Sequence, residues 1–61
     1  MYKLQNRYQD SGWEDLHIKF TNEKDAIQEA SVLCKDAICY GMVRVVDMVN
    51  KRVVIEFPAG G

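Results

Sequence analysis

Residues 21–41 read TNEKDAIQEASVLCKDAICYG, and this stretch separates two segments in which polar and apolar residues alternate. Thr21 or Asn22 can cap a helix, and the acidic residues of the next turn favour the positive end of the helix dipole. Gly41 can turn the chain back at the far end. The sequence therefore predicts a helix over residues 22–38. Its apolar residues recur at steps of three and four and form one stripe: Ala26, Ile27, Ala30, Leu33, Cys34 and Ala37.

The segment before this helix, residues 2–20, alternates polar and apolar side chains on both sides of the sequence QDSGW at residues 9–13. A period of two over this length is typical of half-buried strands. We expect a hairpin over residues 2–20, closed by a short turn in which Gly12 is left-handed. In the register that follows, Arg7 lies opposite Asp15, Gln5 opposite His17, and Leu4 opposite Ile18.

A second hairpin is predicted after the helix, over residues 42–57, where the alternation returns. Its turn, residues 47–51, can repeat the first turn with Asn50 in the left-handed position, because Asn tolerates that conformation best after Gly. Pro58 ends the last strand because it has no backbone N–H to donate to a neighbouring strand. Residues 58–61 then form a short tail. In this register Val45 lies opposite Val53, and Val43 opposite Ile55.

Together these elements predict an α+β fold of the type β-hairpin–α-helix–β-hairpin (ββαββ). Its four-stranded, mainly antiparallel sheet has one helix packed on one face. The 61 residues make a single small domain, residues 1–61, because a second hydrophobic core does not fit in so short a chain. The pattern leaves the order of the strands in the sheet open.

Composition narrows the class of protein. Hydrophobic residues make up 48% of the chain and charged residues 28%, which is typical of a globular protein and not of a disordered one. No apolar run approaches the roughly 20 residues of a membrane span, and no apolar run of a secretory signal follows the first charges. Cys34 and Cys39 alone form no disulfide framework, so we expect a cytoplasmic protein without membrane contact.

One helix covers only one side of a sheet, so the other side, here called the open face, meets either water or a partner. Trp, Met and Arg, which are enriched in protein interfaces, lie on this face by the predicted registers. The alternative is a solvated face with ordinary cross-strand ion pairs. The face is predicted to carry more cations (Lys3, Arg7, Lys19, Arg44, Arg52) than acids (Asp15, Glu56), whereas the helix is acidic.

We therefore expect a domain that acts by protein–protein contact, as a homodimer through the open face or with another protein, and has no catalytic role. The predicted interface residues are Trp13, His17, Met42, Arg44, Val46 and Val54. A second alternative is weak nucleic-acid binding, since a basic sheet face can stack bases. Only Trp13 is aromatic on the predicted face, and no RNP-like or GxxG motif occurs, so nucleic acid has little support as a partner.

Few residues are suited to chemistry. His17, the only histidine, can act as a general base or pH switch, but the register puts no Ser or Cys beside it to serve as a nucleophile. The spacing of Cys34 and Cys39 is not that of a CxxC redox motif. One His and two Cys are too few for a four-ligand zinc site within one chain. The sequence therefore predicts no enzyme, no metal and no cofactor.

The chain ends in two glycines, Gly60 and Gly61, after its last strand. With the strand–strand–helix–strand–strand order, this tail resembles the ubiquitin-like sulfur carriers of molybdopterin and thiamine synthesis. The resemblance covers the last residues and the order of elements. It implies a carrier protein whose flexible tail enters the active site of a partner enzyme, with Gly61 as the adenylated residue and Gly60 as its slender neighbour. This carrier function is the first alternative to the interaction domain.

Overall fold

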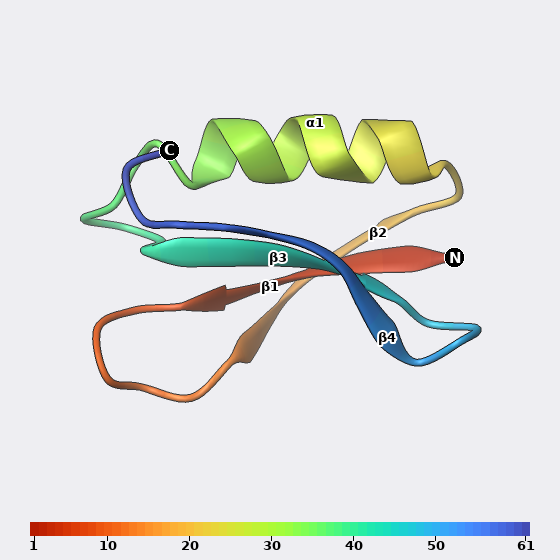
Figure 1. The fold of residues 1–61 in the computed structure, drawn as a ribbon, viewed down its shortest axis with the longest axis horizontal. Helices are drawn as coiled ribbons and strands as arrows, with labels where there is room; N and C mark the ends of the chain where they lie inside the picture. Colours follow the sequence, from red (N-terminus) through yellow and green to blue (C-terminus); the bar gives the residue numbers. More distant parts are fainter.

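The computed structural model describes all residues 1–61 and has one helix packed on one face of a four-stranded sheet (Figure 1). In the sheet the strand order is β2-β1-β3-β4, and every neighbouring pair is antiparallel, which confirms the predicted ββαββ fold. The helix is too short and too polar to cross a membrane. In chain order the elements are β1 (Tyr2–Arg7), β2 (Glu14–Phe20), α1 (Glu23–Leu33), β3 (Met42–Asp47) and β4 (Arg52–Phe57).

The helix begins where it was predicted but ends earlier. Asn22 is its cap, since the Asn22 side chain accepts a backbone N–H of the first turn at 2.8 Å. The predicted end at residue 38 is wrong, because α1 ends at Leu33. Just beyond that end, the Asp36 side chain accepts the Cys39 backbone N–H at 3.1 Å. Asp side chains compete in this way for nearby backbone donors, so Asp36 starts a separate turn.

The first hairpin has the predicted register at the end away from its turn and a different register beside the turn. Asp15 lies opposite Gln5, and not opposite Arg7. The pairing shifts because β2 bulges at His17, whose φ of 60° lies in the left-handed region. The bulge adds two residues to β2 relative to β1. Because side chains alternate between the two faces, an even number of added residues leaves the strands on either side of the bulge with the same faces as before. At the end of the hairpin away from its turn, Tyr2 pairs with Phe20 and Lys3 with Lys19.

Both turns place a different residue in the left-handed region from the one expected. In the first turn it is Gln9, with φ of 54°, and not Gly12. In the second turn it is Lys51, with φ of 55°, while Asn50 donates its side-chain amide to the Asp47 carboxylate at 2.8 Å. Asp47 also accepts two backbone N–H groups of the turn, at 2.9 and 3.2 Å. These three hydrogen bonds organise a turn that is one residue longer than expected.

The longer turn changes which residues of β4 face the helix. Val45 lies opposite Ile55 and Val46 opposite Val53, so Val54 is an extra residue that bulges between these two pairs. The predicted register, with Val45 opposite Val53, is therefore wrong. Val54 packs against the core, and Val53 takes its place on the open face.

The core lies between α1 and the two central strands, β1 and β3. Two alanines on the helix are fully buried there, and such small side chains let a helix approach a sheet closely. Cys34, at the C-terminal end of the helix, is buried as the apolar stripe predicts. The buried cluster consists of Leu4, Ala26, Ala30, Cys34, Val43 and Val45.

Candidate functional site

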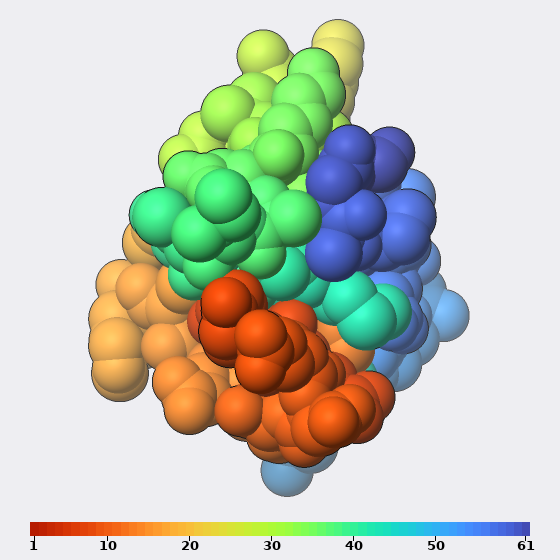
Figure 2. Space-filling view, turned by 90° about the vertical axis from the view of Figure 1, so that its left-hand side faces the viewer, coloured from red at the N-terminus to blue at the C-terminus, as the bar shows by residue number.

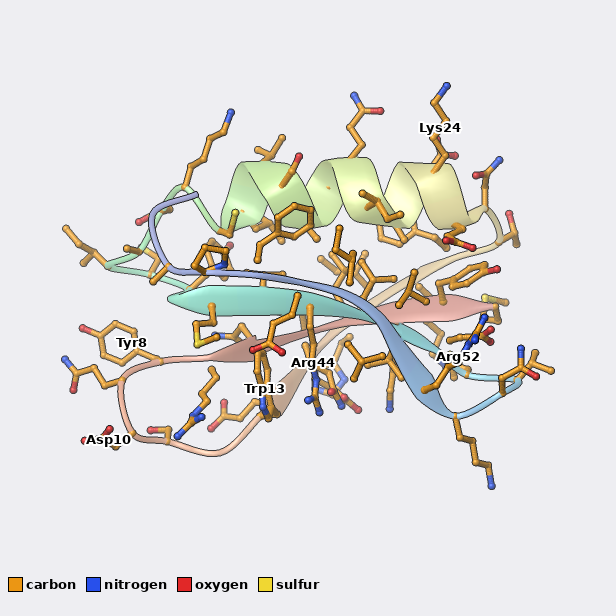
Figure 3. The ribbon with its side chains drawn as sticks, viewed as in Figure 1. Tyr8, Asp10, Trp13, Lys24, Arg44 and Arg52 are labelled. Carbon is orange, nitrogen blue, oxygen red and sulfur yellow. The ribbon has the colours of Figure 1, made fainter.

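The open face lies on the side of the sheet away from α1, and Trp13 and Arg44 project from it (Figure 3). The strand registers show which side chains share this face, because Arg44 of β3 lies opposite both Gln5 of β1 and Glu56 of β4. No element of the chain covers it. Its residues are Lys3, Gln5, Arg7, Trp13, Asp15, Lys19, Met42, Arg44, Val46, Val53 and Glu56.

A continuous chain of side-chain contacts crosses the open face. The Arg44 guanidinium carbon lies 4.1 Å from the centroid of the Trp13 ring, in a cation–π contact. The Nε of Arg44 donates to Gln5 Oε1 at 2.8 Å, and Gln5 Nε2 donates to Asp15 Oδ1 at 2.8 Å. Lys3 Nζ lies 3.4 Å from the same Asp15 oxygen. Side chains from three strands and one loop therefore hold each other in place.

The charges in this chain of contacts are unequally matched. The hydrogen bond from Gln5, followed by the positive charge of Lys3, lowers the pKa of the Asp15 carboxyl below its usual value. Lys3 and Asp15 form the only ion pair of the chain. Arg44 makes no ion pair with Glu56 opposite it, and its terminal nitrogens donate to no acceptor in the chain. Arg44 is thus fixed in position with its terminal nitrogens unpaired.

Beside Arg44 the face is hollowed. The hollow has a volume of about 390 Å³ and is wide open to solvent. Its cations come from both central strands and from the second turn, and no acidic residue lines it. The lining residues are Lys3, Gln5, Arg44, Val46, Met48, Lys51 and Val53. Because Lys3 is paired with Asp15, an anion would meet the unpaired positive charges of Arg44 and Lys51 here, together with apolar side chains of the lining.

The predicted interface residues are only partly brought together. Val54 is misplaced in the prediction, because the β4 bulge turns it to the core, and Val53, with 43% of its surface exposed, stands on the open face instead. His17 is exposed at the β2 bulge and takes no part in the chain of contacts. On the face itself lie Trp13, Met42, Arg44 and Val46.

Sequence reasoning missed two residues that shape this site. Gln5 joins the Arg44 and Asp15 side chains, since its amide accepts from one and donates to the other. Lys51 lines the hollow from a turn where Asn50 was expected to be left-handed. The role of Gln5 between the Asp15 carboxylate and the Arg44 guanidinium can be predicted only when the strand register is known. Beside the first turn, where Gln5 lies, the register predicted from the sequence is wrong.

The groups considered for chemistry are His17, Cys34 and Cys39. No three His, Cys, Asp or Glu side chains lie close enough to hold a metal ion. Cys39 is exposed, and a hydrogen bond to the Asp36 carboxylate, together with the charge of Asp36, raises the pKa of the Cys39 thiol. A thiol held in its protonated form is a weak nucleophile.

The C-terminal tail folds back on the end of the helix. The Gly60 N–H donates to the Cys34 carbonyl at 2.7 Å, and the Gly61 N–H donates to the Pro58 carbonyl at 3.2 Å. Figure 2 shows the tail in dark blue, beside the green segment that follows α1. A carrier function would require this docked tail to detach before it enters another protein.

Comparisons with protein-family models, with curated proteins and with solved structures found no match to this chain.

Proposed function

We propose that this domain acts by protein–protein contact through its open face. The observation that carries the proposal is the chain of contacts from Trp13 through Arg44 to Lys3, on a side of the sheet that no element covers. Fixing long side chains costs conformational entropy. A partner that binds side chains already in place avoids much of that loss, which is the advantage of a preorganised surface.

The outer strands favour the face over the sheet edges as the contact surface. β2 bulges at His17 and β4 bulges at Val54, so both edges of the sheet are irregular. Bulges on outer strands are a common means of preventing a further strand from pairing with a sheet. A partner that adds a strand to either edge therefore fits this domain poorly.

The charge of the face favours an acidic partner. Four cations (Lys3, Arg7, Lys19, Arg44) and two acids (Asp15, Glu56) lie on it. Two identical faces in a homodimer would bring these excess positive charges together, which opposes association. The homodimer stays a prediction, and the acidic partner is the one that we propose.

Peptide display tests the proposed contact surface and needs no identified partner. Random peptides are selected against the wild-type domain and then assayed with two variants. Val53→Glu changes an exposed valine of the open face, and Val32→Glu changes an exposed valine of the helix, where the side chain is 55% exposed. We expect selected peptides to lose binding to V53E and to keep binding to V32E. Binders that depend on Val32 would contradict the proposal.

Sedimentation equilibrium tests the homodimer separately. A micromolar dimer that V53E dissociates, and V32E does not, would identify a second copy as the partner. Such a dimer should tighten as salt is added, because salt screens repulsion between the two basic faces. An acidic partner should instead bind more weakly as salt is added. The sign of the salt effect thus separates the two kinds of partner.

A further inference from the structure

Arg44 is held in position by two neighbouring side chains, and its terminal nitrogens make no hydrogen bond within the chain. Stacking on Trp13 at 4.1 Å and the Nε hydrogen bond to Gln5 at 2.8 Å fix the plane of its guanidinium. Only the Nε donor is used within the chain. The two terminal nitrogens form the edge that binds a carboxylate through two parallel hydrogen bonds in typical Arg–carboxylate pairs.

The surroundings of Arg44 fit a carboxylate that is carried next to apolar side chains. Lys3 and Lys51 add positive charge on the lining of the same hollow, and no acidic side chain lines it. Glu56 lies opposite Arg44 in the sheet but makes no ion pair with it. Lys3 already forms an ion pair with Asp15. Lys51 is therefore the only lining cation, apart from Arg44, that forms no ion pair. The remaining lining is Gln5, which accepts a hydrogen bond from Arg44, and the apolar side chains of Val46, Met48 and Val53.

From this arrangement we infer that the hollow binds an acidic segment of a partner protein. Arg44 receives one Asp or Glu carboxylate, and the valines of the hollow contact an apolar neighbour of that residue. Lys51 adds attraction at the rim. The inference rests on the proposed protein contact and deepens it by naming the chemistry of the partner.

A nucleic-acid strand fits the same hollow less well. Arg44 already covers one side of the Trp13 ring, and Trp13 is the only aromatic side chain on the open face. Binding of single strands depends on bases stacking on exposed aromatic rings.

An NMR titration of the ¹⁵N-labelled domain tests the inference with a defined probe. The probe is an acetylated and amidated peptide of alternating Glu and Leu, and its control has Gln in place of every Glu. We expect shift changes that centre on Arg44 and Val46 with the Glu peptide, and binding at least about tenfold weaker with the Gln peptide. A change of this size is expected when charge-assisted hydrogen bonds are lost.

Substitution of individual cations tests whether Arg44 is the residue that binds the peptide carboxylate. Arg44→Gln should weaken binding of the Glu peptide about tenfold, and Arg44→Lys should weaken it by a smaller factor, because Lys keeps the charge without the planar edge. Lys51 lies in an exposed turn, so Lys51→Gln should not disturb folding. This variant should weaken binding about twofold. Lys24→Gln removes an exposed cation of the helix as a matched control and should change binding little.

Three outcomes would overturn the inference. The first is equal binding of the Glu and Gln peptides, and the second is equal loss of binding in R44Q and K24Q. The third is tighter binding of a ten-residue thymidine oligonucleotide than of the Glu peptide. If display peptides lose binding to V53E but bind R44Q as they bind the wild type, the protein contact stands and the carboxylate site fails. The carboxylate site can therefore fail while the proposed protein contact stands.

Discussion

Gly41 passes so close to the Arg7 backbone that a Cβ atom built on Gly41 would overlap the Arg7 carbonyl oxygen. Gly41 also has a φ of 72°, a left-handed conformation that side chains disfavour. It lies directly before β3, where the chain returns from the helix to the centre of the sheet. The contact leaves no room for any residue other than glycine.

Gly41→Ala should therefore destabilise the fold by about 1–3 kcal/mol, the usual cost of one strained backbone position. Guanidinium denaturation, followed by circular dichroism, measures this change in the free energy of unfolding. Gly12→Ala is the control, because nothing lies within 4 Å of a Cβ atom built on Gly12. That variant should stay within about 0.5 kcal/mol of the wild type. Equal effects of the two substitutions would contradict the described path of the chain.

The cap of the helix predicts a second matched pair of variants. Asn22→Ala removes the side chain that accepts the backbone N–H of Lys24 at 2.8 Å, and should lower stability by about 1 kcal/mol. Thr21→Ala changes the other residue that the sequence offered as a cap, and should change stability by less than about 0.5 kcal/mol. Thermal unfolding of both variants decides between them. A larger loss in T21A would move the cap to Thr21.

The Asp47 turn predicts how stability depends on pH. Hydrogen bonds from Asn50, first from its side chain and then from its backbone, hold the pKa of Asp47 below the ordinary value of 3.8. The native state therefore favours the ionised carboxylate, so this stabilisation is present above the unfolded pKa. It is lost as the pH falls through the lowered native pKa.

Scans of Tm between pH 7 and pH 2.5 measure this dependence. Asn50→Ala should flatten the acid limb, since the main cause of the lowered pKa is removed. Asp10→Asn is the control, because Asp10 is an exposed loop carboxylate that accepts no hydrogen bond. It should leave the acid limb unchanged. An acid limb that is as steep in N50A as in the wild type would show that Asp47 does not cause it.

The docked tail predicts slow amide exchange at Gly60. Its N–H donates to the Cys34 carbonyl at 2.7 Å, whereas the N–H of Gly12 takes no part in a backbone hydrogen bond of the turns and loops. Hydrogen exchange followed by NMR should therefore find Gly60 protected relative to Gly12. If both glycines exchange at the same rate, the tail is free in solution. A free tail is what the carrier alternative requires.

The order and type of the elements could be predicted because their signals are local. The stripe that includes Ala26 and Ala30 repeats at helical spacing, and a period of two marks each strand. The register could be predicted only at the end of the first hairpin away from its turn. In the first hairpin, the bulge at His17 shifts the pairing of β1 with β2. In the second hairpin, the hydrogen bonds of Asp47 lengthen the turn, and the bulge at Val54 shifts the pairing of β3 with β4.

The same errors explain which parts of the candidate site were predicted. Trp13, Arg44 and Val46 stay on the open face, because the shift of register leaves the alternation of β1 and β3 unchanged. Val54 changes sides because the inserted residue lies in its own strand. The role of Gln5 depends on the neighbours that two other strands bring to it, so no pattern within β1 could reveal it.

The strand order β2-β1-β3-β4 has a kinetic consequence. The two central strands come from different hairpins, and their partners Gln5 and Arg44 are 39 positions apart in the chain. The buried cluster joins Leu4 of one hairpin to Val43 and Val45 of the other, so neither hairpin can bury it alone. Folding must close this long loop before the core forms, and loop closure of this kind slows folding. The two halves of the chain therefore fold as one cooperative unit.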